Sequence, residues 1–392
     1  MPVTPVIRDR AEVEELARQA RSAGRFALDF EFLWERTYRP IPCLAQVSVE
    51  NEVTLIDPVE GAPLEPIAEL VADPDVETIM HAPSADLTLL ALHFGTRPER
   101  VTDVQLAAGF VGIGAGQSLA TLLERTLQIR IEKTEGFSDW SARPLNDAQL
   151  RYAANDVLHL LPLHDELKRR VAERQRDPWV REEHERRYGP SARFVTEPMD
   201  AWRRIKGQGT LNPTDRAVLR EVGAWRELEA MRRDRPPAWI MQDRLALDVA
   251  KRKPTDQSGL ARVRGLTDRI RDREARELLD AVGRGVAGTP IELGRQIRPD
   301  LAARISVLAS LGQLIVGVRA EAAELAAPLL ATREEIETYL AACIQGNGDD
   351  FPLAGGWRRE LAGEALSRLA AGQLALAPTT TPPYLEEIDQ RP

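Results

Sequence analysis

Cysteine and long apolar segments are both scarce in this chain of 392 residues. The two cysteines, Cys43 and Cys343, stand far apart, which argues against a disulfide framework and against a thiolate metal site. No apolar run approaches the roughly 18 residues that span a bilayer, so we expect no membrane partner. The beginning of the chain has no apolar core of the kind found in secretion signals. These absences predict a protein of the reducing cytoplasm.

Positive charge is also in deficit, because the formal net charge is −9. Such a deficit argues against nucleic acid as a partner, but the charges are unevenly distributed. Residues 1–178 hold 19 Lys and Arg against 29 Asp and Glu, whereas residues 198–290 hold 20 against 14. Cations bound to the acidic front would let it meet phosphates, and the basic middle would add attraction.

The composition is otherwise ordinary for a globular protein of two or three domains, with 43% hydrophobic and 29% charged residues. Strands are expected at 25–32, 43–50, 52–58 and 76–81, the second and third joined by a tight turn at Glu50–Asn51. Helices are expected at 13–24, 63–73, 84–95, 101–112, 117–129 and 146–175, the last with a candidate break at Pro162. This order predicts an α/β front, with a mixed sheet flanked by helices.

Strand patterns end near residue 180, and the rest of the chain has helical periodicity. A polar segment looks like a connector, and the Pro- and Thr-rich end is expected to be extended or disordered. The expected domains are 1–178, 198–285 and 290–375, with a linker at 179–197 and a tail at 376–392.

Two acidic residues interrupt the apolar text "FALDFEF". Because strand side chains alternate, Asp29 and Glu31 point to one face and Phe30 to the other. A solvated strand face is the ordinary explanation of such a pair. In a central strand, however, the two carboxylates repel each other, and each raises the pKa of the other.

Three more polar residues fall where they can meet this strand. Asp86 is expected in the first turn of a helix, where an acid facing the helix dipole is ordinary. Tyr152 and Asp156 are four apart and share one helix face amid apolar neighbours, although a pair with Arg151 or a Tyr–Asp hydrogen bond would also explain them. His81 is expected to be a packed histidine rather than a ligand.

Together, the four carboxylates suggest one shared cation site. Divalent ions would relieve their repulsion, and ligands that are all oxygen suit Mg²⁺ or Mn²⁺ rather than zinc. Two such ions about 3.5–4 Å apart support in-line displacement at phosphorus, because one activates water and the other stabilises the leaving oxygen.

The series Asp29-x-Glu31, Asp86 and Tyr152-xxx-Asp156 resembles the three exonuclease motifs of the DEDD superfamily, tyrosine subgroup. The texts "TYRPIPCLAQVS", "TDVQLAA" and "FSDWSARPLNDAQLRYAANDV" are similar to ribonuclease D. Residues 201–254 resemble the helicase-and-RNase-D C-terminal (HRDC) domain. The texts "LATREEIETYL" and "GGWRRELAGEAL" resemble a second, more divergent HRDC-like domain.

This resemblance implies an RNase H-like exonuclease domain followed by two all-α HRDC-like domains. It also implies a metal-dependent 3′–5′ exoribonuclease that trims RNA 3′ ends, such as those of tRNA precursors, and releases nucleoside 5′-monophosphates. Asp29, Glu31 and Asp156 would hold the cation that carries the attacking water. Asp29 would also contact a second cation supported by Asp86. Tyr152 would orient the water, because a phenol that titrates at about pH 10 suits positioning better than general-base work.

Substrate contacts are expected from nine further residues, although packing or a solvated face is the ordinary alternative for each. They are Arg36, Thr37, Tyr38, Gln105 and Arg143 in the front domain and Lys206, Lys251, Arg252 and Lys253 in the basic region. Arg143 and Trp140 also look like parts of a structural corner. Trp202, Trp225 and Trp239 are expected to be core residues.

Two other functions remain open from sequence alone. A DNA 3′–5′ exonuclease would use the same site, and a catalytically silent RNA-binding scaffold would keep the fold without the reaction. The presence of all four acids and of the tyrosine argues against the scaffold. The chain is expected to act as a monomer.

Overall fold

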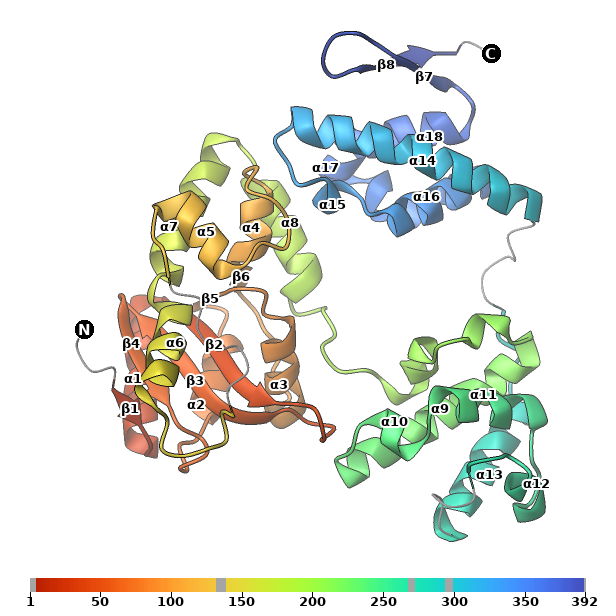
Figure 1. The fold of residues 1–392 in the computed structure, drawn as a ribbon, viewed down its shortest axis with the longest axis horizontal. Coiled ribbons are helices and arrows are strands. Elements are labelled where there is room, and N and C mark those ends of the chain that lie inside the picture. Colours follow the sequence, from red (N-terminus) through yellow and green to blue (C-terminus); the bar gives the residue numbers. More distant parts are fainter. Residues whose placement is uncertain (1–4, 132–138, 267–271, 293–298, 391–392) are drawn as a thin grey trace.

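The computed structural model describes residues 5–131, 139–266, 272–292 and 299–390. They form a sheet-containing front region followed by two helical regions (Figure 1). The expected fold class is therefore confirmed. Phe137 and Ser138, which begin one of the ribonuclease D-like texts, lie outside the described residues.

A six-stranded mixed sheet forms the centre of the front region, in the order β1-β4-β3-β2-β5-β6. The strands are β1 (Val6–Ile7), β2 (Arg25–Leu33), β3 (Ile41–Val49), β4 (Glu52–Ile56), β5 (Glu77–Met80) and β6 (Val101–Asp103). Strand β2 pairs antiparallel with β3 and parallel with β5, so it lies inside the sheet. The predicted turn between β3 and β4 is present, and Glu50 and Asn51 both have the positive φ that a two-residue hairpin loop favours.

Two strands of this sheet are not predicted by the sequence pattern. Strand β1 has two residues and pairs parallel with β4. Strand β6 occupies the start of the segment 101–112, for which the pattern predicts a helix. Helix α4 (Val104–Gly109) begins directly after it, with Asp103 as its N-cap. Three residues are too few for alternation to distinguish a strand from a helix.

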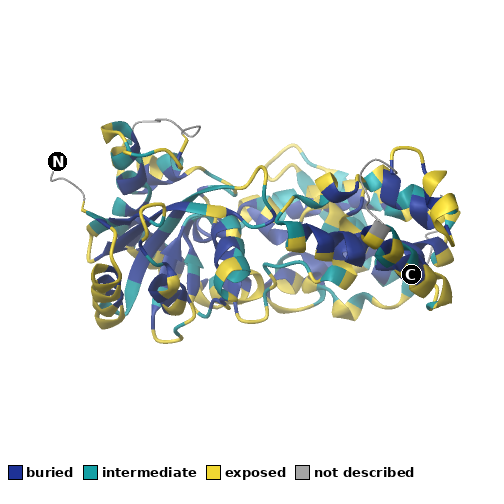
Figure 2. Cartoon of the chain, turned by 90° about the horizontal axis from the view of Figure 1, so that it is seen from below, coloured by how far each residue is buried: buried dark blue, intermediate teal, exposed yellow. Residues whose placement is uncertain are grey.

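Helices cover both faces of the sheet, which is buried between them (Figure 2). They are α1 (Arg10–Ala23), α2 (Glu65–Val71), α3 (Ser84–Phe94), α5 (Leu119–Leu127), α6 (Asp147–Leu158) and α7 (Leu160–Glu173). Phe26, Leu28 and Phe30 pack with α1, α2 and α3. The residues that alternate with them, Asp29 and Glu31, therefore face α6, which packs over β2, β3 and β4.

The long helical pattern at 146–175 is divided at His159 into α6 and α7. Pro162 lies in the first turn of α7, where its missing N–H leaves no intrahelical bond unmade. The predicted break is therefore confirmed close to the proline.

The polar segment 179–197 is more than a connector, because α8 (Asp177–Tyr188) includes its first half. Glu183 is fully buried, and Trp179 stacks on Trp357 of the last helical region with ring centroids 5.4 Å apart. The charge-rich sequence conceals this packing, since charged residues usually lie at the surface but Glu183 lies inside.

The first helical region has its own apolar core around Trp202 and Trp225. Its elements are η1 (Pro198–Arg204), η2 (Gln208–Thr210), α9 (Pro213–Arg233), α10 (Pro237–Ile240), α11 (Asp243–Arg252), α12 (Gln257–Ala261) and α13 (Asp272–Ala287). Trp202 and Trp225 are buried, as predicted. The prediction for Trp239 is wrong, because it lies on the single turn α10 with 53% of its surface exposed.

The last region packs around the long helix α14 and ends in an antiparallel hairpin. Its helical elements are α14 (Pro299–Ala322), α15 (Ala327–Leu330), α16 (Arg333–Gln345), η3 (Gly348–Asp350), η4 (Pro352–Ala354), α17 (Gly356–Arg358), η5 (Arg359–Gly363) and α18 (Glu364–Ala370). The hairpin strands are β7 (Leu374–Pro378) and β8 (Leu385–Asp389). The tail is thus extended and paired.

Helix α14 corrects the expectation that no segment is apolar enough to cross a membrane. Residues Leu301–Ala322 have a mean hydropathy of 1.8 and pass that test by length and composition. Arg304 and Arg319 interrupt the segment, so a search for unbroken apolar runs does not find it. One such helix is weak evidence for a membrane, and α14 packs against α16 and α18.

Candidate active site

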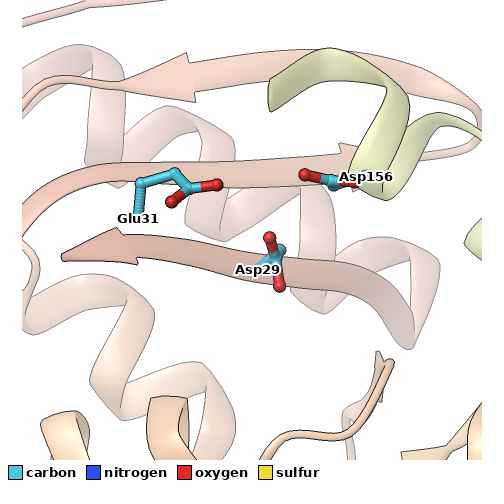
Figure 3. Close-up of side chains that lie close together, drawn as sticks. All are labelled: Asp29, Glu31 and Asp156. Atoms are coloured by element: carbon cyan, nitrogen blue, oxygen red, sulfur yellow. The ribbon is translucent and has the colours of Figure 1, made fainter. Parts of the chain in front are cut away.

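Asp29 and Glu31 lie in the middle of β2, on the face that α6 covers. The register with β3 places Gln46 opposite Asp29 and Leu44 opposite Glu31, and it shifts directly after Glu31. Such a bulge bends a strand and redirects its end. Carboxylate oxygens of Asp29, Glu31 and Asp156 all lie within 4.8 Å of one another (Figure 3).

Helix α6 supplies Asp156 and Tyr152 to the same site. Asn146 and Gln149 form a reciprocal capping box that fixes the start of this helix. The Tyr152 hydroxyl, one turn earlier on the helix, favours the charged form of Asp156 and so opposes the effect of burial on the pKa of that carboxyl group. The ring of Trp140 packs against that of Tyr152 with centroids 5.9 Å apart, which holds the phenol at the site.

Asp86 is the most buried of the four acids, with 6% of its surface exposed. It lies in the first turn of α3, as predicted. The backbone N–H of Phe30 favours the charged forms of both Asp86 and Asp29, so it opposes the rise of their pKa values. Asp86 lies outside the group of mutually close oxygens, but its charge acts on Asp29 more strongly than that of Asp156 or Glu31.

All four carboxyl groups have raised pKa values. Burial is the largest cause, and it helps to raise the pKa of Glu31 to about 8 and those of Asp86 and Asp156 to about 7. The pKa of Asp29 is held well above its usual range by burial and then by the charges of its three acidic neighbours. This is the direction expected for like charges that share a site.

Positive side chains do not neutralise this cluster. In the described part of the chain, no ion pair reaches the four carboxylates, and no lysine or arginine is among the causes of their pKa shifts. Four carboxylates without an internal cation are an oxygen-only ligand set of the kind that holds Mg²⁺ or Mn²⁺.

Gln46 is a residue of this site that our reasoning from sequence missed. It is fully buried, and neither its amide oxygen nor its amide nitrogen has a hydrogen-bond partner among the residues that the structure describes. An unmade bond of this kind costs about 1–3 kcal/mol. Residues opposite each other in an antiparallel pair have Cβ atoms about 4.5–5.5 Å apart on one face, so the amide lies beside Asp29. Water molecules on a cation at Asp29 would satisfy it. The available signal was a glutamine inside the apolar text "CLAQVSV".

The loop after β2 carries three of the expected substrate residues, and the structure gives each of them different surroundings. The Tyr38 side chain is buried, and its hydroxyl donates to Glu227 of α9 at 2.7 Å. The Thr37 hydroxyl donates to the Arg39 carbonyl at 2.6 Å. The side chain of Arg36 is exposed. The predicted substrate contact of Tyr38 receives no support from this geometry, in which the residue anchors the first helical region to the sheet.

Arg143 has protein partners that make it a structural clamp, and its predicted phosphate contact receives no support from this geometry. Its guanidinium donates to both carboxylate oxygens of Asp57, at 2.5 and 2.7 Å, and to the carbonyl of Cys43 at 2.7 Å. These bonds tie the corner around Trp140 to the sheet, as the alternative interpretation of this segment expected.

Gln105 also has protein partners. Its amide nitrogen donates to the Gln117 carbonyl at 3.0 Å, and His81 bonds to the same carbonyl at 2.9 Å. His81 is thus a packed histidine, as predicted. The predicted substrate role of Gln105 receives no support from this geometry.

The four basic residues of the first helical region also differ in their surroundings. Lys253 ends α11 in the left-handed conformation and pairs with Asp215, so its charge is already compensated. Lys206, Lys251 and Arg252 have exposed side chains. Their phosphate contacts remain a prediction.

A mixed sheet whose inner strand and covering helix present these carboxylates defines a protein of the 3′–5′ exonuclease class. A family model described as 3′–5′ exonuclease matches residues 5–172, and the HRDC domain model matches residues 215–282.

Comparison with individual proteins then identifies the family within this class. Ribonuclease D of Zymomonas mobilis is 32% identical over 382 residues, covering 96% of each chain. Ribonuclease D of Acidiphilium cryptum is 37% identical over 353 residues, covering 89% of this chain and 88% of the relative. The crystal structure of Escherichia coli RNase D, described as an exoribonuclease involved in structured RNA processing, superimposes with a TM-score of 0.77 at 27% identity. That comparison covers 94% of this chain and 99% of the other. The chain belongs to the ribonuclease D family.

Proposed function

We propose that this 3′–5′ exoribonuclease hydrolyses the last phosphodiester bond of an RNA 3′ end with two divalent cations, Mg²⁺ or Mn²⁺, and releases nucleoside 5′-monophosphates. The observation that carries the proposal is the convergence of the Asp29, Glu31 and Asp156 carboxylate oxygens within 4.8 Å. The orphaned amide of Gln46 beside Asp29 supports the fit of hydrated cations to this site.

Divalent cations bound at such a site neutralise the phosphate and lower the pKa of a bound water. Asp29, Glu31 and Asp156 form the close set of carboxylates and would hold one cation. Asp86 couples more strongly to Asp29 than the other acids do, so these two would hold the second. The repulsion that raises the four pKa values in the free protein becomes cation affinity when the site is loaded.

Tyr152 positions water and does not accept its proton in this proposal. Burial and then the charges of Asp156 and Glu31 raise the pKa of the phenol above its usual range, so it keeps its proton at neutral pH. A protonated hydroxyl on the same helix face as Asp156 can orient a water molecule beside that carboxylate.

Structured RNAs with accessible 3′ ends, tRNA precursors among them, are the proposed substrates. The similarity to a relative described as acting in structured RNA processing supports this choice. The exposed residues Lys206, Lys251 and Arg252 are candidates for phosphate contacts. Action as a monomer and a cytoplasmic location stay predictions.

A time course on an RNA stem with a 3′ single-stranded tail tests the proposal, with Mg²⁺, Mn²⁺ or EDTA in parallel. Stepwise shortening from the 3′ end that EDTA abolishes is the expected result. Internal cuts would contradict it. A DNA substrate of the same sequence tests whether the enzyme distinguishes ribose from deoxyribose. Faster digestion of the DNA would favour the alternative of a DNA exonuclease.

A further inference from the structure

Two aromatic and two cationic residues lie on the two segments through which the front region contacts the first helical region. We call the set of Trp34, Arg36, Arg235 and Trp239 the seam. Trp34 and Arg36 belong to the loop after β2. Arg235 lies between α9 and α10, and Trp239 lies on α10. In Figure 1 the loop between β2 and β3 reaches toward α10.

Both tryptophan side chains are unusually exposed to solvent for their size. Trp34 is 41% exposed and Trp239 is 53% exposed, whereas Trp202 and Trp225 of the same part of the molecule are buried. The Trp34 indole N–H donates to the Tyr38 carbonyl at 2.9 Å, which fixes the orientation of its ring. Two large aromatic faces are thus held in solvent by ordered backbone.

Guanidinium groups accompany the two rings. Arg235 donates to the Arg36 carbonyl at 3.3 Å, and its guanidinium carbon lies 5.9 Å from the centre of the Trp239 ring. The nearby acids Asp234 and Glu227 already accept hydrogen bonds from the backbone and hydroxyl of Tyr38, so they are occupied. Glu35 is the exposed acid of the same loop.

The seam also begins close to the acidic cluster. Trp34 follows Glu31 by three residues, and a strand advances about 3.3 Å per residue, so their backbones are no more than about 10 Å apart. Exposed aromatic faces combined with positive charge are the features with which proteins hold single-stranded nucleic acid.

We propose that the seam binds the single-stranded RNA that precedes the 3′-terminal nucleotide, with bases stacked on Trp34 and Trp239 and phosphates near Arg36 and Arg235. This proposal rests on the exoribonuclease function and adds a site to it. The first helical region thereby becomes part of the substrate path, because the Tyr38 contact with Glu227 keeps the two halves of the seam together.

Kinetics on two substrates test this site. One is a dinucleotide, which ends before the seam, and the other is a single-stranded oligoribonucleotide of about ten nucleotides, within the usual size of such sites. For Trp34→Ala and for Trp239→Ala, the ratio of kcat/KM on the long substrate to that on the dinucleotide is expected to fall about 5- to 100-fold. Trp34→Phe keeps an aromatic face but loses the N–H, and its ratio is expected to stay near that of the wild type.

Binding measured without turnover completes the test. The anisotropy of a labelled oligoribonucleotide in EDTA gives Kd as a function of salt. Arg36→Gln is expected to reduce the slope of log Kd against log salt by about 0.7, the value for one phosphate contact on a single strand. Matched controls are Tyr384→Ala, an exposed aromatic on the C-terminal hairpin loop, and Arg18→Gln, an exposed arginine on α1.

Three results would overturn the proposal. The seam variants would match Tyr384→Ala and Arg18→Gln, or they would lose activity equally on both substrates. Alternatively, Trp34→Phe would fail as badly as Trp34→Ala, which would show that only the hydrogen bond matters. Wild-type enzyme that leaves both substrates intact with Mg²⁺ or Mn²⁺ would instead refute the exoribonuclease function itself.

Discussion

Glu183 and the group around Asp29 are both buried carboxylates, but the chain surrounds them in opposite ways. Glu183 has no exposed surface, and Arg186, Arg187 and Arg358 all pair with it, the last at 2.7 Å. Burial alone would raise its pKa, but these guanidinium groups lower it to about 2. The four acids of the site have raised pKa values, and no positive side chain within the described ranges pairs with them.

This difference separates a structural joint from a catalytic site. Glu183 and Arg358 join α8 to the last helical region, next to the stacked rings of Trp179 and Trp357. A buried charge that the protein neutralises itself stabilises one arrangement of the chain. A buried cluster that it leaves unneutralised favours a ligand of opposite charge, and in the function we propose that ligand is a divalent cation.

Asp29→Asn is expected to show the largest effect of the variants that test this comparison. It removes the carboxylate that couples to all three other acids, so cation binding and transition-state stabilisation are lost together. We expect kcat to fall on the order of 10⁴-fold, or about 5.5 kcal/mol. The measurement is single-turnover digestion of the tailed stem RNA with saturating Mg²⁺. Unchanged activity would show that the reaction occurs elsewhere.

Glu183→Gln is the matched change at the structural joint. It leaves Arg358 buried without a full countercharge, and loss of one partner from a buried pair costs about 3–5 kcal/mol of unfolding free energy. Urea denaturation measures this loss, and kcat well below the melting temperature should remain near that of the wild type. A variant that keeps its stability but loses activity would reverse the roles we assign to the two regions.

The dependence of stability on pH should also differ between the two regions. A carboxyl group whose folded pKa is raised opposes folding once the unfolded chain has lost its proton, so the site acids destabilise the metal-free protein as pH rises from about 4 to about 8. Glu183 contributes stability above its unfolded pKa, and this contribution is lost as pH falls toward 2.

Asp86→Asn isolates the contribution of one site acid. In EDTA, the difference in unfolding free energy between this variant and the wild type should grow by a few kcal/mol, in favour of the variant, as pH rises from about 5 to about 8. The reason is that the Asp86 pKa is raised from 3.8 to about 7. Saturating Mg²⁺ should shrink that gain, since the cation stabilises the charged wild-type site. Activity of the wild type should fall as pH drops below about 7, where protons compete with the cation. A gain that is the same at both pH values would argue against a raised pKa.

The sequence predicted those parts of the fold and site that depend on local pattern. Alternation within β2 placed Asp29 and Glu31 on one face, and the i, i+4 spacing on α6 placed Tyr152 beside Asp156. The raised pKa values of the paired acids were also expected, and their direction is confirmed.

Features that depend on long-range contacts were missed. Tyr38 looked like a substrate residue because it follows the acidic strand, but its partner Glu227 lies far along the chain. The stacking of Trp357 on Trp179 was not predicted, because the sequence around one tryptophan does not show where the other one packs. Gln46 was passed over because one polar residue in an apolar strand has no meaning until its neighbour across the sheet is known.

Gln46 therefore gives the smallest and most specific prediction. Replacing its amide with the apolar side chain in Gln46→Leu removes a buried group that lacks partners, so the metal-free protein should gain about 1 kcal/mol of unfolding free energy. If the amide supports a hydrated cation beside Asp29, the same change should weaken Mg²⁺ affinity about 10- to 100-fold, as losses of groups that support metal ligands do. Ser48→Ala is the matched control. Ser48 also lies buried on β3, and its hydroxyl has no partner among the described residues, but it lies opposite Ala27 instead of an acid. Calorimetric Mg²⁺ titration separates the two variants, and equal affinities would show that the Gln46 amide is a packing defect with no part in the site.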